Sequence, residues 1–275
     1  MQFNDITVVI TTFKSEHIIF KCIDSIPVNL KIIIVENSND IEFKRKVEAH
    51  SSNVQCFLLN QNRGYSSGNN FGLAKVKTKY GLLLNPDTRL TKDSLNNFFL
   101  TISNYPNFSI IAPNQENKKK LNKSNITEVD NIKGFAIFFN MEKFNNVFFD
   151  ESFFLYFEEI DLCKQIKNNN GLILIDSKII IEHDGGGSVK LLSKIELEKN
   201  RNWHWMWSTF YFHKKYRGFL IALIMVTPKL FSSIFKVIFY SVLFNKKLKN
   251  LYLCRLSGLL NSIIGKKSWY RPRLD

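Results

Sequence analysis

The sequence has little cysteine, and what it has is scattered. Its four cysteines stand far apart without a Cys-x-x-Cys pair, which suggests neither a disulfide framework nor a zinc knuckle and fits a reducing cytoplasm. No glycine occurs between Thr11 and Lys14, after the first apolar run, which argues against a P-loop or a dinucleotide-binding fold. Residues 1–20 lack a basic start followed by an apolar stretch, so we expect no cleaved signal peptide.

Acidic side chains are almost absent from the last quarter of the chain. Residues 201–275 carry 14 basic side chains and one acidic one, whereas residues 1–200 carry 24 and 23, so the formal charge of +14 belongs to the C-terminal part. We therefore expect a main domain over residues 1–215 and a basic, apolar helical region over residues 216–275.

The C-terminal part predicts amphipathic helices. Residues 219–226 form an apolar run of eight, too short to span a bilayer alone, and Thr227-Pro228 predicts the N-cap and first position of a new helix. A wide apolar face with lysines is typical of a helix that lies in a membrane interface, and further lysines and arginines suit anionic headgroups. A helical hairpin packed on the main domain, a docking face for a protein partner, and two transmembrane helices with a buried lysine stay open as alternatives. The polar side chains of this helix recur at spacings of three and four: Lys229, Ser232, Ser233, Lys236 and Tyr240.

The first 200 residues alternate between short β-branched runs and helical patterns, which predicts an α/β sheet with helices on both faces. We expect strands at residues 6–12, 31–35, 54–59, 80–84, 109–112, 135–139, 172–175 and 179–182. We expect helices at residues 16–26, 67–77 and 93–105, and one that begins near Glu158.

Ligands bind such sheets beyond the carboxyl ends of the strands, and this sequence has polar residues there. Glu36 follows the second strand, where it can accept hydrogen bonds from a base or a ribose, or belong to a simple turn. Asn62 and Gly64 open a stretch with three glycines and three asparagines in eleven residues, whose N–H groups suit phosphate. Asp87 follows another strand, and His183 comes before a glycine-rich loop.

Three carboxylates stand within four positions at Glu158, Glu159 and Asp161, directly after an aromatic run. A helix that begins there favours acids near its positive end, and an aromatic wall raises the pKa of an acid that has no partner. These acids are candidates for a general base, and the alternative is a solvated helix start.

Together these segments closely resemble the family 2 glycosyltransferases, particularly the branch with bacterial rhamnosyltransferases of surface-polysaccharide assembly. The resemblance covers about residues 5–215 and lies in the order of the motifs, because each motif alone is weak. It implies a GT-A fold, a nucleotide-sugar donor such as a UDP- or dTDP-sugar, a divalent cation and inversion at the anomeric carbon. The segments that carry it are Val-Ile-Thr-Thr-Phe-Lys (9–14), Val-Glu-Asn-Ser (35–38), Asn62-Arg63-Gly64 with Gly68-Asn69-Asn70, Leu-Asn-Pro-Asp-Thr (84–88), the aromatic-acidic segment 149–163, and His183 with its glycine loop.

The resemblance assigns roles to individual residues. Asp87 corresponds to the last acid of the family's Asp-x-Asp element and would bind Mg²⁺ or Mn²⁺, with His183 as a second ligand that favours Mn²⁺. Asn85 replaces the first acid of that element. Glu159 corresponds to the family's general base, a position where aspartate is usual, so Glu158 or Asp161 is a credible substitute. The remaining donor-binding candidates are Thr11, Thr12, Glu36, Asn62, Gly64, Asn69, Asn85 and Arg201.

These observations predict an inverting, metal-dependent glycosyltransferase, peripheral on the cytoplasmic face of the plasma membrane, that extends a lipid-linked glycan and binds no nucleic acid. A sugar-phosphate nucleotidyltransferase is the first alternative, although the loop after the first strand lacks the glycine-rich basic pattern of such enzymes. A nucleic-acid or anionic-surface binder that uses the C-terminal charge is the second. A degenerate, inactive transferase is a third, given Asn85, Glu36 and Glu159.

Overall fold

The structure is a computed structural model that describes residues 3–114, 126–145, 148–185 and 194–271. The chain divides into two compact units. The sheet unit comprises Met1–Asp150 with Glu159–Lys190, and the helical unit comprises Glu151–Glu158 with Leu191–Asp275. Each unit has its own buried apolar core.

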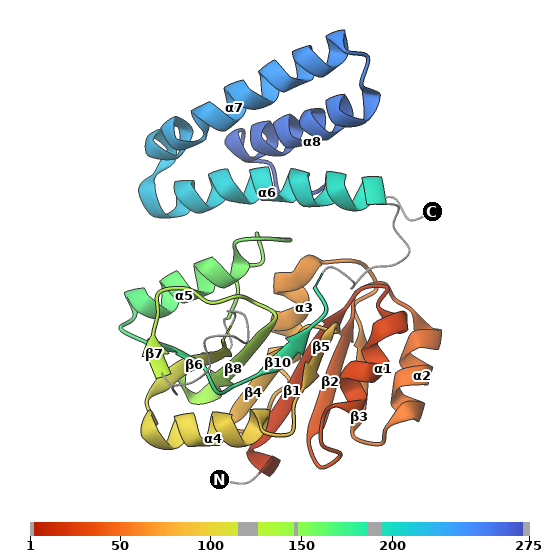
Figure 1. The fold of residues 1–275 in the computed structure, drawn as a ribbon, viewed down its shortest axis with the longest axis vertical. Helices are drawn as coiled ribbons and strands as arrows, with labels where there is room; N and C mark the ends of the chain where they lie inside the picture. Colours follow the sequence, from red (N-terminus) through yellow and green to blue (C-terminus); the bar gives the residue numbers. More distant parts are fainter. Residues whose placement is uncertain (1–2, 115–125, 146–147, 186–193, 272–275) are drawn as a thin grey trace. The chain divides into compact units, whose positions relative to one another are not determined.

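The sheet unit is built on an eight-stranded, mostly parallel sheet in the order β3-β2-β1-β4-β8-β6-β9-β7 (Figure 1). β8 runs antiparallel to β4 and β6, and β7 runs antiparallel to β9. β5 and β10 form a separate two-stranded antiparallel ribbon. The strands are β1 (Ile6–Thr12), β2 (Lys31–Glu36), β3 (Val54–Leu58), β4 (Tyr80–Leu84), β5 (Thr88–Leu90), β6 (Phe108–Pro113), β7 (Ile126–Glu128), β8 (Ala136–Asn140), β9 (Leu172–Asp176) and β10 (Ile181–His183).

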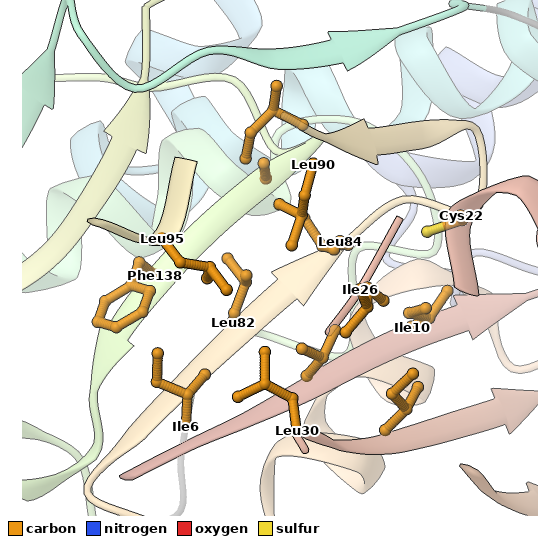
Figure 2. Packing of buried hydrophobic residues seen from close by; sticks show 14 of the residues in the cluster. Ile6, Ile10, Cys22, Ile26, Leu30, Leu82, Leu84, Leu90, Leu95 and Phe138 are labelled. Atoms are coloured by element: carbon orange, nitrogen blue, oxygen red, sulfur yellow. The ribbon is translucent and has the colours of Figure 1, made fainter. Parts of the chain in front are cut away.

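Helices cover both faces of this sheet, because β1 and its neighbours are apolar on both sides. Val8 and Ile10 belong to the core under α1, α2 and α4, whereas Val9 belongs to the core under α3 and α5. Figure 2 shows part of the first core, where Leu82 of β4 lies near Phe138 of β8. The helices of the sheet unit are α1 (Glu16–Asp24), α2 (Ile41–His50), α3 (Gly64–Leu73), α4 (Ser94–Asn104) and α5 (Glu158–Asn168), whose first residue is grouped with the helical unit.

This architecture confirms the predicted α/β fold, and every segment predicted as a strand overlaps an observed one, although β10 begins two residues later than predicted. The sequence prediction missed α2, whose apolar pattern is limited to Phe43 and Val47 and whose start is fixed by the Asp40 side chain, which accepts a hydrogen bond from the Phe43 N–H at 3.0 Å. It also missed β5 and β7, which have three residues each and carry too little pattern to recognise.

The helical unit consists of α6 (Lys194–Arg217), α7 (Phe219–Val242) and α8 (Lys246–Ile263), together with residues 151–158 (Figure 1). α6 and α8 approach closely at Gly258, where an added Cβ would lie 2.2 Å from the backbone oxygen of Trp203. The Ser262 hydroxyl donates to the Trp207 carbonyl at 2.8 Å, one turn further along both helices. Small side chains on α8 therefore set the distance between these two helices.

The predicted helix start at Thr227-Pro228 is wrong. α7 is continuous from Phe219 to Val242 with Pro228 inside it, and the Thr227 hydroxyl donates to the Leu223 carbonyl at 2.7 Å, a bond typical of a helix interior. The apolar sequence around Pro228 keeps this segment helical, although the proline removes one backbone hydrogen bond. With 24 residues, α7 is long and apolar enough to cross a membrane by length and composition alone.

Candidate functional site

The carboxyl ends of β1, β2 and β4 meet at one edge of the sheet. Parallel pairing aligns Thr12 with Glu36 at this edge, and Ile10 with Leu84 two residues before it. The loops that follow these strands carry most of the residues predicted to bind a ligand. This edge of the sheet unit is the candidate functional site, as expected for parallel sheets.

Glu36 is buried at the end of β2, with 1% of its surface exposed. The Thr12 hydroxyl donates to its Oε2 at 2.6 Å, and the N–H and hydroxyl of Ser38 donate to its Oε1, the N–H at 2.7 Å. Burial nevertheless raises the pKa of Glu36, because the hydrogen bonds from Ser38 and Thr12 offset only part of the desolvation. Glu36 is thus a hydrogen-bond acceptor in a fixed position, and burial makes its ionised form less favourable than it would be in water.

Asn37 fixes the loop that leads into α3. Its Nδ2 donates to the Gly64 carbonyl at 3.0 Å, and its Oδ1 accepts from the Arg63 N–H at 3.3 Å. The Asn62 side chain accepts from the Gly64 N–H at 3.0 Å, where a positive φ of 88° suits glycine. Sequence reasoning gave Asn37 no role, although its place directly after the buried strand β2 was a usable signal.

α3 approaches the end of β1 through Gly68, where an added Cβ would lie 2.4 Å from Cγ2 of Thr11. Beside this contact lie buried polar atoms without a hydrogen-bond partner among the described residues: Thr11 Oγ1, Ser66 Oγ, and both amide atoms of Asn69. Asn69 is completely buried. Such groups are uncommon in native proteins and are usually satisfied by ordered water or a ligand, so this region can take a polar ligand or water.

Asp87 and His183 come together although they are far apart in the sequence. β10 pairs with β5 so that His183 lies opposite Thr88, and the Asp184 N–H donates to the Asp87 carbonyl at 3.0 Å. His183 Nε2 is 3.4 Å from Asp87 Oδ1. The His183 ring stacks on the Phe135 ring, with centroids 4.7 Å apart and planes 6° apart. The carboxylate is buried and the imidazole is partly exposed, so the pair is accessible from one side.

This pair fits two ligands of one divalent cation. Two donors in adjacent positions around an octahedral ion, each about 2.1 Å from it, lie about 3 Å apart. Within the described residues no group of three or more histidine, cysteine or acidic side chains could hold a metal, so the pair would bind only a cation that takes its other ligands from water and phosphate oxygens. Asn85 is half-buried next to the pair, and its carbonyl accepts from the Thr88 hydroxyl at 2.7 Å.

The acids of α5 differ in their surroundings. Asp161 is completely buried and accepts from Gln165 Nε2 at 2.5 Å, and Glu158 is 6% exposed. Glu159 is half-buried, and burial raises the pKa of this carboxyl, the direction that a general base near neutral pH requires. Tyr156 and Phe157, just before the helix, have positive φ values of 69° and 71°, an uncommon conformation for aromatic residues that marks a strained turn.

Two consecutive residues, Gly134 and Phe135, connect Glu159 to the Asp87–His183 pair. The Cβ of Glu159 would be 3.5 Å from a Cβ at position 134, and the Gly134 carbonyl accepts from the Tyr65 hydroxyl at 2.5 Å. The Phe135 ring stacks on His183, and the Phe135 carbonyl accepts a hydrogen bond from the Asn85 N–H at 2.8 Å. The base candidate and the cation-ligand candidates therefore both contact one short segment of the sheet unit.

The remaining donor-binding candidate, Arg201, is exposed on α6 in the helical unit. Trp203 and Trp207 are buried in the core of that unit, and their indole N–H groups donate to the Ser257 hydroxyl at 3.2 Å and the Lys266 carbonyl at 2.9 Å. These two tryptophans therefore pack in a core. Trp205 is 41% exposed.

The chain belongs to glycosyl transferase family 2, whose family model matches residues 7–163. A hexosyltransferase of low-salt glycan biosynthesis, Agl10 of Haloferax volcanii, is 26% identical over 196 residues. That match covers 61% of this chain and 63% of the archaeal protein, so the chain spans less than two thirds of that relative's length. Residues 7–163 are accordingly a glycosyl transferase family 2 domain.

Solved structures agree on the fold. The mannosyltransferase PcManGT from Pyrobaculum calidifontis, determined with GDP-Man and Mn²⁺, superposes with a TM-score of 0.58 at 10% identity and covers 96% of this chain and 88% of its own. S. aureus TarS (residues 1–349) gives a TM-score of 0.54 at 14% identity over 92% and 90%. GalNAc-T7 with UDP, GalNAc and Mn²⁺ gives 0.53 at 12% identity over 65% and 42%. The sheet unit thus has the GT-A glycosyltransferase fold.

Replacing Glu36 by glutamine should stabilise the protein near neutral pH. Because burial raises the pKa of Glu36 in the folded state, its favourable contribution is complete below the unfolded pKa, about 4.3, and is lost as the pH rises through the folded pKa. At pH 7 the ionised carboxylate costs free energy that a neutral amide does not. Thermal unfolding of Glu36→Gln should give a Tm a few degrees above wild type at pH 7, with a difference that shrinks toward pH 4.

The matched control is Glu42→Gln, at an exposed acid of α2, which should change the Tm little at any of these pH values. A Glu36→Gln protein with a lower Tm than wild type at pH 7 would contradict this account of the carboxylate.

Proposed function

We propose that this family 2 member is an inverting, metal-dependent glycosyltransferase that transfers a sugar from a UDP- or dTDP-sugar to a lipid-linked glycan during surface-polysaccharide synthesis. The observation that carries the proposal is the Asp87–His183 pair at the carboxyl edge of the sheet, separated from the acid Glu159 by Gly134 and Phe135. A cation site and a base that contact the same segment are the two groups that displacement at an anomeric carbon requires.

In this mechanism Asp87 and His183 would hold a divalent cation, which would supply positive charge to the leaving diphosphate. Glu159 takes the proton from the acceptor hydroxyl while that oxygen forms a bond to the anomeric carbon. The bond from this carbon to the diphosphate oxygen breaks on the opposite side, which inverts the configuration. Burial raises the pKa of Glu159 and makes it a stronger base than an exposed glutamate.

The donor's nucleoside would bind beside Thr11, Thr12 and Glu36, because these residues end β1 and β2 at the same edge. The fixed loop at Asn62 and Gly64 would border the donor. Asn69 and Asn85 would satisfy further polar groups of the donor, Asn69 with an amide that has no partner among the described residues.

The donor sugar is proposed from the relatives. The archaeal relative is named a hexosyltransferase, and the mannosyltransferase structure contains GDP-Man with Mn²⁺. A hexose or deoxyhexose donor is consistent with both, and rhamnose is our first candidate because the motifs between residues 9 and 183, in their order, resemble the rhamnosyltransferase branch. The Mn²⁺ in two of the similar structures supports a divalent cation here.

We further propose that α7 and α8 attach the enzyme to the cytoplasmic face of the plasma membrane. α7 exposes its apolar side chains, with Phe231 and Phe235 each 65% and Ile238 59% exposed. Its lysine Lys236 instead turns toward α8, where Nζ donates to the Tyr252 hydroxyl at 3.1 Å. This helix pair directs a lysine inward and apolar side chains outward, which is the reverse of a helix pair in water and suits contact with lipid.

An interfacial position explains α7 better than a transmembrane one. Lys229 and Lys236 lie in the middle of the helix, and each lysine at a bilayer centre costs about 2.5–3.5 kcal/mol. In addition, no acidic side chain occurs between residues 202 and 274, so the cations of this region suit anionic headgroups. Spanning by α7 is the competing arrangement.

The first functional prediction concerns the cation. The full chain should be screened for hydrolysis of UDP-, dTDP- and GDP-sugars. Hydrolysis of the accepted donor should require added Mn²⁺ or Mg²⁺, because the proposed cation site has two protein ligands, Asp87 and His183, and no third within the described residues. Asp87→Ala should abolish turnover, and His183→Ala should raise the Mn²⁺ concentration needed. Asp130→Ala, at a 90% exposed acid, is the control. Full activity in excess EDTA would refute the cation site.

The second prediction concerns the base. Glu159→Gln should lower kcat about 100- to 10,000-fold while donor affinity is kept, because it removes proton transfer alone. The wild-type kcat/KM should fall as the pH drops through a value above the usual range of glutamate, since burial raises the pKa of Glu159 and only the ionised form is a base. This decrease of kcat/KM at low pH should be absent in Glu159→Gln. A comparable loss in Glu158→Gln or Asp161→Asn, with Glu159→Gln active, would transfer the role to that residue.

The third prediction concerns membrane attachment. Serine at Phe231, Phe235 and Ile238 should reduce co-sedimentation with both anionic and neutral phospholipid vesicles, because these side chains contribute apolar burial. Glutamate at Lys246, Lys247 and Lys249 should reduce binding to anionic vesicles only. Donor hydrolysis should survive in both variants.

Point variants serve this test better than a deletion, because removing α8 would uncover Trp203. Serine at Val28 and Leu100, exposed apolar residues of the sheet unit, is the matched control and should leave vesicle binding unchanged. Resistance of the wild type to extraction from vesicles by alkaline carbonate would indicate a spanning helix and contradict the peripheral arrangement.

A further inference from the structure

We propose that Arg89 is a positioning residue that holds the His183 imidazole at Asp87 by clamping the two residues on either side of His183. The inference deepens the proposed function, because it assumes the cation site formed by Asp87 and His183. The clamp and the cation site can fail separately, and the Mn²⁺ titration distinguishes these outcomes.

The clamp follows from the register of the β5–β10 ribbon. Arg89 lies directly opposite Glu182, and His183 lies opposite Thr88. Neighbouring residues of a strand face opposite sides, so Glu182 and Asp184 share one side of β10 while His183 faces the other. Arg89 Nε donates to Glu182 Oε2 at 3.1 Å, and its two terminal nitrogens donate to the two carboxylate oxygens of Asp184 at 2.8 Å each.

A clamp is needed because the ribbon is short. Each strand has three residues, and a two-stranded ribbon is marginally stable by itself. The beginning of β10 is tied down separately, since the hydroxyls of Thr91 and Ser94 donate to the Ile180 carbonyl at 3.1 and 2.6 Å. The His183 end is held by the bond from the Asp184 N–H to the Asp87 carbonyl, by the Phe135 stack and by the Arg89 fork. A bidentate guanidinium–carboxylate pair fixes orientation as well as distance.

The direction in which Mn²⁺ affinity changes when Arg89 is removed distinguishes a positioning role from a purely electrostatic one. An arginine near a cation site repels the cation, so removing its charge alone should tighten Mn²⁺ binding. If Arg89 positions His183, its removal should instead weaken Mn²⁺ binding, because the imidazole loses its fixed place. Outer-shell partners of metal ligands typically contribute 10- to 100-fold to affinity, and for an indirect partner we expect about tenfold.

The experiment is a titration of the full chain with Mn²⁺, followed by electron paramagnetic resonance, with Mn²⁺ alone and with UDP or GDP added. Arg89→Ala should raise the Kd about tenfold, and Asp184→Asn should do the same, since it opens the clamp from the other side. The double variant should bind no worse than either single variant, because both remove one interaction. Arg45→Ala, at an exposed, ion-paired arginine of α2, should leave the Kd unchanged.

Unchanged or tighter binding by Arg89→Ala would overturn the clamp. A loss in Asp184→Asn without a loss in Arg89→Ala would overturn it too, because Asp184 would then be a ligand itself. If Arg89→Ala does not fold, judged by its Tm, Arg89→Lys keeps the charge but not the fork and should bind Mn²⁺ with a raised Kd, whereas a wild-type Kd would overturn the clamp. A wild-type protein that binds no Mn²⁺ under any condition would overturn the cation site and the clamp with it, whereas failure of the clamp alone leaves the proposed function standing.

Discussion

The site depends on one antiparallel strand in an otherwise mostly parallel sheet. β8 lies between β4 and β6 and runs against both, so that Ala136 pairs with Leu84. Its beginning therefore lies at the edge where the parallel strand β4 ends. Were β8 parallel, its end would be there instead, and Gly134 and Phe135 would lie at the far edge of the sheet. The direction of this strand gives Phe135 its contacts with Asn85 and His183, and Gly134 its place beside Glu159.

A second constraint is the close packing of α3 on the sheet. An added Cβ at Gly72 would lie 2.4 Å from Cγ1 of Val9, and one at Gly68 equally close to Thr11. α3 can therefore lie near enough for Asn70 to exchange two hydrogen bonds with the backbone of Phe149, at 2.8 and 2.9 Å. These bonds fix the chain shortly before the acidic segment. Packing of α3 on the sheet and the position of Phe149 are thus parts of one arrangement.

Much of the sheet unit could be predicted from the sequence, because β-branched runs and the polar residues after them are local signals. The ends of β2 and β4 pointed to Glu36 and Asp87 without any knowledge of tertiary contacts. The contacts of Asn37 and Arg89, and the bridge at residues 134–135, could not be predicted, since each depends on segments that are distant in the sequence. The helix start expected at Thr227 failed for another reason. Local capping chemistry was outweighed by an apolar segment that keeps α7 continuous.

The central claim is that Asp87 and His183 bind one divalent cation at the carboxyl edge of the sheet. Crystals of the full chain grown with MnCl₂ and, in turn, UDP, dTDP and GDP would test it through the anomalous scattering of manganese. The account predicts one strong peak within about 2.3 Å of both an Asp87 carboxylate oxygen and His183 Nε2, with nucleotide phosphate completing the coordination. A nucleotide bound at this edge without such a peak, or with manganese held by other side chains, would contradict it.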